Sequence, residues 1–237
     1  EIIEKNLICL NSLDNPLKKL PLFNGSTEKN LEKFLLYLNK LNYSRRKNIK
    51  SVGEVQIVKN KKSALYFDSG EPPTYKLSKD YQSGPLSFEY SNDDQKIITN
   101  CGYGRKISKK LQLLSKFTSA QSTLCINDTS VVKFKRNNLI NKAYGSTISD
   151  TFKILDFERL EDKTNIKISA THNAYLGKYG YLHKRSITLR KKNCEIFGND
   201  LLIKKIDNTN IKFSVRFHLY PGISTVKTIS GKSILLQ

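Results

Sequence analysis

Apolar and polar residues alternate along much of the chain after residue 51, and this period of two predicts β-strands. The longest alternation, residues 211–219, places Ile211, Phe213, Val215, Phe217 and Leu219 on one face and Lys212, Ser214, Arg216 and His218 on the other. Residues 165–171 and 183–190 alternate in the same way, with Ile166, Ile168 and Ala170 sharing one face of the first, and His183, Arg185, Ile187 and Leu189 sharing one face of the second. The faces that carry the apolar residues are expected to point into a core.

Shorter apolar runs add further expected strands, at residues 55–58, 64–67, 86–90, 96–100, 123–126, 129–135, 194–197 and 201–203. The first two runs form one expected hairpin, and 123–126 and 129–135 form another around Asn127-Asp128. About a dozen short strands without alternating helices predict a mainly β fold, an antiparallel β-sandwich, rather than an α/β protein.

Residues 80–102 combine the expected hairpin 86–90/96–100 with short polar residues at both ends. Gln82, Ser83 and Gly84 precede the first strand, and Asn100 and Gly102 end the second. Polar residues at strand ends are where a rigid sheet often presents a site. The basic segment that follows, 103–118, has no clear period and is expected to be a loop or a short helix.

Residues 1–50 differ from the rest of the chain. Leu31, Phe34, Leu35, Leu38 and Leu41 recur at helical spacing after an expected N-cap at Ser26 or Thr27, which predicts one amphipathic helix of about four turns ending near residues 43–46. We therefore expect a helical segment and linker over 1–50 and a β domain over 51–237. The lack of an initiator Met and of a signal peptide, together with the apolar last residues, leads us to expect a piece of a longer protein.

The net charge of +20, from 41 Lys and Arg against 21 Asp and Glu, favours polyanionic partners such as nucleic acid, anionic lipid or acidic polysaccharide. A lysine-rich composition spread along the chain is the alternative explanation, because the lysines do not cluster in a tail. No apolar stretch is long enough to span a membrane.

The four cysteines are scattered without a CxxC pair, so zinc-ribbon and redox motifs are excluded. Cys101 and Cys125 are expected to be buried small hydrophobic residues. The three histidines, His172, His183 and His218, are too far apart in sequence to indicate a metal site.

Eight short strings, in order along nearly the whole chain, resemble the C-terminal part of the heparinase II/III-like polysaccharide lyases. They are Pro21-Leu22-Phe23-Asn24-Gly25, Asp68-Ser69-Gly70, Gly84-Pro85-Leu86-Ser87-Phe88-Glu89, Asn100-Cys101-Gly102, Ala120-Gln121-Ser122-Thr123-Leu124, His172-Asn173-Ala174-Tyr175, His183-Lys184-Arg185 and Arg216-Phe217-His218-Leu219-Tyr220-Pro221-Gly222.

This resemblance implies an N-terminal α/α toroid joined to a C-terminal β-sandwich, with residues 1–50 as the end of the toroid and 51–237 as the sandwich. It also implies β-elimination from an acidic, uronic-acid-containing polysaccharide such as a glycosaminoglycan. A bacterial periplasm or cell envelope is the implied location. In the family, a Tyr and a His of the toroid carry out much of the proton transfer, and they would lie outside this chain.

Some members add to the sandwich a catalytic histidine and a zinc held by His, Asp and His. Here the ligand positions fall at Gln82, Asn100 and Gln121, and the catalytic histidine falls near Asp80. Neutral amides are poor zinc ligands. We therefore expect no cofactor, and a hydrogen-bonded amide cluster in place of the zinc.

The candidate substrate-binding residues are His172, Tyr175, His183, Arg185, Arg105, Tyr103 and His218. Tyr103, near Arg105, is a candidate to stack on a sugar ring. The other six candidates have structural alternatives: a surface loop for His172 and Tyr175, a buried polar network for His183 and Arg185, an outward strand face for His218, and a solvated loop for Arg105 with Lys106, Lys109 and Lys110. Two functions follow from the resemblance: a polysaccharide lyase, and a non-catalytic sandwich that binds polyanionic glycan. A nucleic-acid binder ranks last, because only the net charge supports it.

Overall fold

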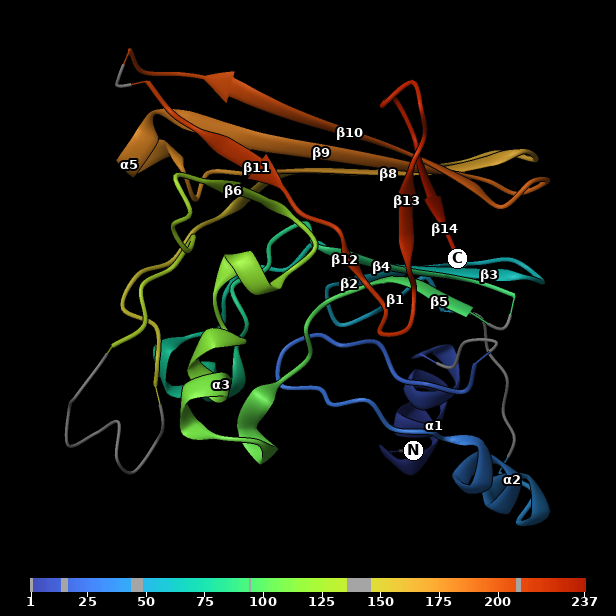
Figure 1. Cartoon of the computed structure of the whole chain (residues 1–237). Coiled ribbons are helices and arrows are strands. Elements are labelled where there is room, and N and C mark those ends of the chain that lie inside the picture. Colours follow the sequence, from blue (N-terminus) through green and yellow to red (C-terminus); the bar gives the residue numbers. More distant parts are fainter. Residues whose placement is uncertain (1, 14–16, 44–48, 94, 136–145, 208–209) are drawn as a thin grey trace.

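Two stacked antiparallel sheets form the body of the protein in the computed structural model, which describes residues 2–13, 17–43, 49–93, 95–135, 146–207 and 210–237 (Figure 1). The larger sheet has the strand order β1-β2-β3-β4-β5-β12 and the smaller one β10-β9-β8-β7. The larger sheet consists of β1 (Ser51–Val52), β2 (Val55–Lys59), β3 (Ser63–Asp68), β4 (Phe88–Asn92), β5 (Gln95–Thr99) and β12 (His218–Leu219). The smaller consists of β7 (Ile154–Glu161), β8 (Asn165–His172), β9 (Tyr181–Arg190) and β10 (Glu195–Lys204). The predicted antiparallel sandwich is confirmed.

The main core fills the space between the two sheets. Its members alternate along the strands, as the sequence predicted: Val58, Leu65, Phe67, Leu86, Phe88 and Tyr90 from the larger sheet side, and Ile166, Ile168, Ala170, Ile187 and Leu189 from β8 and β9. Burial of these apolar faces is the principal force that holds the sheets together.

A second core lies around the two-stranded pair β6 (Leu124–Ile126) and β11 (Phe213–Val215). Phe152, Tyr175 and Tyr179 pack against these strands. Tyr175 precedes the short helix α5 (Leu176–Tyr179), which ends at Gly180 in the left-handed conformation. This second core fixes the segment between β8 and β9 against the loops that follow β6.

The larger sheet is also covered on its outer face. Ile57, Ala64 and Tyr66 pack there with Leu13, the last residue of helix α1 (Ile2–Leu13), whose carbonyl accepts a hydrogen bond from the Tyr66 hydroxyl. Figure 1 shows α1 on the side of this sheet that faces away from the smaller sheet. Because β3 is covered on both faces, all six of its residues are buried.

Helix α2 (Glu32–Lys40) is shorter than the predicted helix and begins later. The residues before it form an extended bridge, Lys19 with Asn30, and the Asn30 side chain accepts a hydrogen bond from the Glu32 amide. No residue of α2 is fully buried. Of the predicted apolar stripe, Leu31 is buried just before the helix, Leu35 and Leu38 are partly buried, and Phe34 and Leu41 are exposed. The predicted end at 43–46 falls partly outside the described residues.

Three strand predictions were wrong in detail. Residues 211–219 form two short strands, β11 and β12, and Phe213 and Phe217 are exposed because the two strands join different sheets. Residues 123–135 do not form a hairpin, since β6 pairs with β11 instead. The two strands predicted at 194–197 and 201–203 are one continuous strand, β10, and β7 was not predicted.

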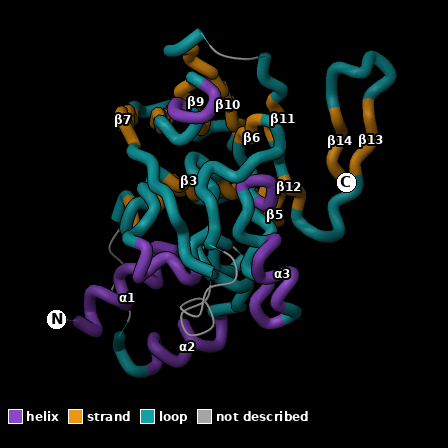
Figure 2. Tube along the Cα trace, turned by 90° about the vertical axis from the view of Figure 1, so that its left-hand side faces the viewer, coloured by secondary structure: helices purple, strands orange, loops and turns teal. Residues whose placement is uncertain are grey.

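The predicted hairpins at 55–67 and 86–100 are confirmed as β2–β3 and β4–β5. The basic segment after the second hairpin contains the 3-10 turn η2 (Gly104–Lys106) and helix α3 (Lys109–Leu114), and the 3-10 turns η1 (Tyr75–Asp80) and η3 (Thr118–Ala120) flank the same corner. The last residues form the hairpin β13 (Thr225–Lys227) and β14 (Ile234–Leu236), which stands away from the sheets (Figure 2). No helix among the described residues is long and apolar enough to cross a membrane.

Candidate functional site

The polar residues around the β4–β5 hairpin are brought together where η1, α3 and η3 meet the larger sheet. Gln82 and Gln121 are buried and converge on one acceptor: each side-chain amide donates to the Ser115 carbonyl at 2.8 Å. Gln82 also donates to the Gly102 carbonyl at 2.8 Å and accepts from the Gly25 amide at 3.0 Å. The Gln82 side chain is therefore held by three hydrogen bonds from two loops and a helix end.

Gly25 is required at this contact for two reasons. Its φ of +84° lies in the left-handed region, and a Cβ there would lie 2.7 Å from the Cβ of Asp80. Both conditions favour glycine. The loop before α2 is thereby fixed against the amide cluster.

Asn100, the third amide, is also buried and belongs to the same corner. Its Oδ1 accepts from the Ser122 amide at 2.8 Å, and its own backbone amide donates to Glu89 Oε1 at 2.9 Å. Glu89 in turn forms an ion pair of 2.8 Å with Lys96, and both side chains are buried. The ion pair of Glu89 and Lys96 inside the sheet thus holds the backbone in place at the end of β5.

The zinc implied by the resemblance does not fit these residues. The side-chain nitrogens of Gln82 and Gln121 point at backbone carbonyls and donate to them, so the cluster is arranged around hydrogen-bond donors rather than around a cation. Zinc prefers thiolate, imidazole and carboxylate ligands. Among the described residues, no group of three or more His, Cys, Asp or Glu side chains is close enough to hold a metal ion.

Asp80, near which the resemblance places the catalytic histidine, accepts a hydrogen bond from the Tyr103 hydroxyl at 2.9 Å. Gln112 of α3 donates to the same hydroxyl at 2.7 Å. Burial raises the pKa of Tyr103, with the bond to Asp80 adding to the shift. The Tyr103 hydroxyl is therefore neutral and holds the Asp80 carboxylate in place.

Lys116 lies beside this group with its ammonium buried. It donates to the carbonyls of Lys79 and Ser146, the latter at 2.7 Å. Burial lowers the pKa of Lys116 to about 8, although the nearby Asp80 opposes the shift. Lys116 thus fastens η1 to the segment that leads to β7.

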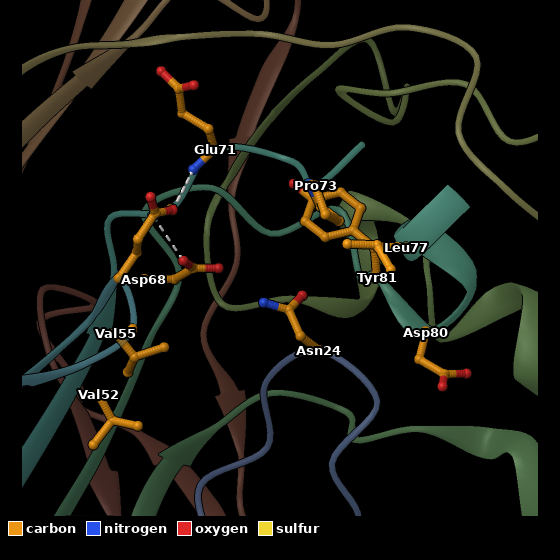
Figure 3. Close-up of a pocket in the computed structure, with 12 residues that line it drawn as sticks. Asn24, Val52, Val55, Asp68, Glu71, Pro73, Leu77, Asp80 and Tyr81 are labelled. Carbon is orange, nitrogen blue, oxygen red and sulfur yellow. Dashed lines mark hydrogen bonds between the residues drawn. The ribbon is translucent and has the colours of Figure 1, made fainter. Parts of the chain in front are cut away.

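Asp80 also lines a cavity of about 350 Å³ between η1 and the β1–β2 turn (Figure 3). The lining includes four carboxylates, Glu54, Asp68, Glu71 and Asp80, and no Lys, Arg or His among the described residues. Burial raises the pKa of Asp68 to about 7, although a hydrogen bond from the Gly70 amide opposes the shift. In a chain of net charge +20, this acid-lined cavity is a local region of opposite sign.

A second polar group, the histidine network, lies where β8, β9 and β10 run side by side. His172 Nδ1 accepts from the Ala174 amide at 3.2 Å, which places the proton of a neutral imidazole on Nε2. That proton is donated to His183 Nδ1 at 3.0 Å, and His183 Nε2 donates to Asp200 Oδ1 at 2.7 Å. Arg185 donates to both oxygens of Asp200, at 2.7 and 3.0 Å.

Burial lowers the pKa of both histidines, most strongly that of His172. Burial opposes ionisation of Asp200, yet hydrogen bonds from His183 and Arg185 lower its pKa to about 2. Arg185 also donates to the carbonyls of Leu86 and Ser122, across the sandwich. The network therefore connects the smaller sheet to the segments that lead into β4 and β6.

The structure separates the predicted substrate-binding residues into buried and accessible ones. His172, His183 and Arg185 each have at most 1% of their surface exposed. For His183 and Arg185, this burial favours the alternative of a buried polar network. For His172, it shows that the alternative of a surface loop was wrong. Tyr175 is equally buried and donates to the Leu124 carbonyl. Burial takes these four side chains out of direct contact with a ligand outside the protein.

The other candidates lie at different places. Tyr103 is buried against Asp80, whereas Arg105 is exposed on η2. His218 was predicted to point outward, but it is half-buried with Nε2 3.0 Å from the Ser119 carbonyl, and burial lowers its pKa. Cys101, predicted to be buried, is exposed, and Cys125 is buried as predicted.

Asp200 and the acid-lined cavity were not predicted from the sequence. Asp200 lies between the two strands expected at 194–197 and 201–203, and the structure places it in the middle of β10 directly opposite Arg185. An acidic residue inside an apolar strand is a signal for a buried ion pair, because such a charge needs a partner. The cavity had no comparable signal, since its lining comes from four separate segments.

The fold and this polar corner define an antiparallel β-sandwich protein with three buried amides, Gln82, Asn100 and Gln121, at one corner of the larger sheet. The family model described as "Heparinase II/III-like, C-terminal" matches residues 45–237. The chain therefore belongs to the heparinase II/III-like family. The domain limits 1–50 and 51–237 stay a prediction.

Similar proteins include both solved lyases and a protein of another name. The heparan sulfate lyase HepC from Pedobacter heparinus has a TM-score of 0.68 and 14% identity over 98% of this chain and 36% of its own. A heparinase III has a TM-score of 0.69 and 10% identity over 95% of this chain and 35% of its own. FtsZ-localized protein C of Caulobacter vibrioides is 25% identical over 178 residues, which are 72% of this chain and 30% of that protein. The chain thus spans about a third of the length of these relatives.

Proposed function

We propose that this chain is the sandwich part of a polysaccharide lyase that cleaves an acidic, uronic-acid-containing polysaccharide by β-elimination. The observation that carries the proposal is the family match over residues 45–237. The fold shared with a heparan sulfate lyase over 98% of the chain and the net charge of +20 support an acidic polymer as substrate.

β-Elimination needs three things: a positive group or donor that offsets the uronate charge, a base for the C5 proton and an acid for the leaving oxygen. The acid-lined cavity beside Asp80 supplies carboxylates and no cation among its described lining, so it does not offset the charge of a uronate. In this proposal the charge-offsetting and proton-transfer groups come from the toroid. The sandwich supplies a rigid wall, held by the amide cluster and the Asp80–Tyr103 pair.

A second function, non-catalytic binding of polyanionic glycan, is favoured by one specific observation. By the resemblance, the catalytic histidine of the sandwich falls near Asp80, and the zinc ligands fall at the three amides Gln82, Asn100 and Gln121. In this interpretation the sandwich has neither the imidazole nor the zinc, and Gln82, Gln121 and Asp80 take part in hydrogen bonds within the protein. The 25% identity to a protein whose name refers to FtsZ, not to a lyase, is compatible with this alternative.

The two functions are separated by incubating the full-length protein with uronic-acid polysaccharides and following the ultraviolet absorbance of the unsaturated product. A rise in absorbance supports the lyase. Binding without any rise on several such polymers overturns the lyase and supports the binding protein. We further propose the periplasm or cell envelope as the location, which fractionation of cells that express a tagged full-length protein tests.

A further inference from the structure

A second hollow, of about 750 Å³, lies on the side of the sandwich that carries α5 (Figure 1). Its lining comes from residues 129–133, 150–153 and 173–179, and its volume lies within the range of about 300–1,000 Å³ common for ligand pockets. Three lysines, Lys133, Lys153 and Lys178, line it together with one carboxylate, Asp150. We call it the lysine groove.

The walls of the lysine groove are fixed by backbone hydrogen bonds. The Asn173 side chain accepts from the Lys153 amide at 2.8 Å, and the Asn173 amide donates to the Lys153 carbonyl at 3.2 Å. On the opposite side, Asp150 Oδ1 accepts from the Lys133 amide at 2.6 Å. The backbones of Lys133 and Lys153 are therefore held in place at the rim of the groove.

The floor of the groove is aromatic and rigid. Phe152, Tyr175 and Tyr179 are buried in the second core, and the Tyr179 hydroxyl is hydrogen-bonded to Thr129 Oγ1 at 2.8 Å. These rings are too deeply buried to stack on a sugar. Recognition in the groove therefore depends on its polar rim, not on its floor.

Two of the three ammonium groups are available for a ligand. Lys153 forms an ion pair of 2.8 Å with Glu71, which uses part of its charge. Neither Lys133 nor Lys178 forms an ion pair with a carboxylate of the described residues, and the Lys178 ammonium lies 5.0 Å from the centre of the Tyr179 ring. An unpaired ammonium at the rim of a pocket attracts an anionic group.

The two hollows of the sandwich differ in sign. The acid-lined cavity carries four carboxylates and no lysine among its described lining, whereas the lysine groove carries three lysines and one carboxylate. An acidic sugar chain is repelled by the first and attracted by the second. The Asn173 oxygen accepts from the Lys153 amide, which leaves the side-chain nitrogen of Asn173 as a donor for sugar hydroxyls.

We propose that the lysine groove binds an acidic oligosaccharide, with its carboxylate or sulfate groups at Lys133 and Lys178. This inference rests on the proposed function, in that it takes an acidic polysaccharide as the ligand. It adds a place on the sandwich where that polymer is held while another part of the protein acts on it.

The test is fluorescence polarisation of the full-length protein with a labelled, sulfated hexasaccharide that contains uronic acid. The double variant Lys133→Glu/Lys178→Glu is expected to weaken binding about tenfold or more, because two attractive charges become repulsive. The matched control is Lys61→Glu/Lys62→Glu, which makes the same charge change in the turn between β2 and β3. It is expected to weaken binding less than about threefold, through the overall field alone.

If the two double variants weaken binding equally, the lysine groove is not the binding site, and the net charge of the protein explains the attraction. Unchanged binding by the groove variant also overturns the proposed binding site, while elimination activity of the wild type keeps the proposed lyase function intact. If the wild type binds no acidic oligosaccharide and forms no unsaturated product, both proposals fail. Urea unfolding of each variant shows whether it is folded, and Lys133→Gln/Lys178→Gln, expected to have an intermediate affinity, replaces any variant that is not.

Discussion

His172 Nε2 lies 3.0 Å from His183 Nδ1 in the interior of the sandwich, and neither side chain is exposed. The Ala174 amide bound to His172 Nδ1 sets the direction of donation toward Asp200. Each bond in this chain uses a neutral imidazole, because a second proton on His172 or His183 would place two donors face to face. The pair is therefore stable only while both rings are uncharged.

Lowering the pH below about 6.5 is expected to destabilise the fold through these two histidines. Their pKa values in the folded state lie below the unfolded value of about 6.5, so the unfolded chain binds protons that the folded chain excludes. The stability is complete above that pH and is lost as the pH falls toward the folded values, by at most about 1.4 kcal/mol per pH unit for each ring. Urea midpoints measured over this range report the loss.

His172→Asn is the matched variant for this experiment, since it removes one of the two buried rings. Its urea midpoint is expected to depend less steeply on pH than that of the wild type. A wild-type urea midpoint that stays constant from neutral pH to about pH 5 would contradict the conclusion that both histidines are uncharged in the folded state. Asp68 titrates in the same range with the opposite sign, so both proteins are best compared in an Asp68→Asn background.

Asp68→Asn is expected to stabilise the protein at neutral and higher pH. Burial raises the pKa of Asp68 to about 7, so between about pH 4 and 7 the unfolded chain releases a proton that the folded chain keeps. The charge on Asp68 therefore lowers the free energy of unfolding. This loss grows between about pH 4 and 7, is constant above that interval, and reaches about 1–4 kcal/mol. Asparagine keeps the acceptor for the Gly70 amide without the charge.

The control for this prediction is Asp162→Asn, at an exposed turn. Hydrogen bonds from Thr164 and Asn165 lower the pKa of Asp162 to about 2, so its charge is favourable in the folded state. This variant is expected to lose stability where Asp68→Asn gains it. If Asp68→Asn and the wild type have equal free energies of unfolding at both about pH 4 and about pH 8, Asp68 does not carry a buried charge.

The strands with a continuous apolar face could be predicted from sequence, and those that change sheets could not. In β8 and β9 the alternating residues all face one core, so period two was sufficient. Residues 211–219 also alternate in sequence, but β11 pairs with β6 and β12 with β5, and Phe213 and Phe217 are exposed. Local pattern does not contain the information on which strand is the partner.

The candidate site divides in the same way. The sequence indicated Gln82, Asn100 and Gln121 as one corner, because a family resemblance fixed their positions relative to each other. It did not indicate that two of them share the Ser115 carbonyl, since Ser115 follows α3 in a segment without a clear period. Long-range partners of this kind depend on packing that no short stretch specifies.

The buried pair of Glu89 and Lys96 gives a third prediction, on stability. Lys96→Met is expected to cost about 3–5 kcal/mol, because it leaves the Glu89 carboxylate buried without its cation. Adding Glu89→Gln is expected to restore most of that loss, since the amide oxygen keeps the bonds from Thr99 and Asn100. Urea unfolding of both single variants and the double variant forms a double-mutant cycle. Additive losses in the cycle would show that the two side chains do not act as a pair.

Removal of metal is expected to leave the stability of this protein unchanged. The side-chain amides of Gln82 and Gln121 donate hydrogen bonds to carbonyls. Their side chains therefore do not direct lone pairs at one shared point where a zinc ion would bind. Elemental analysis of the purified protein should therefore give less than stoichiometric zinc, and a chelator should not lower the melting temperature. The matched variant Gln121→Glu tests the hydrogen bond itself: it replaces the donor to Ser115 by an acceptor, and it should destabilise the fold with or without zinc, by about 1–3 kcal/mol. Stoichiometric zinc in the wild type, or a rescue of Gln121→Glu by added zinc, would mean that the corner binds a metal after all.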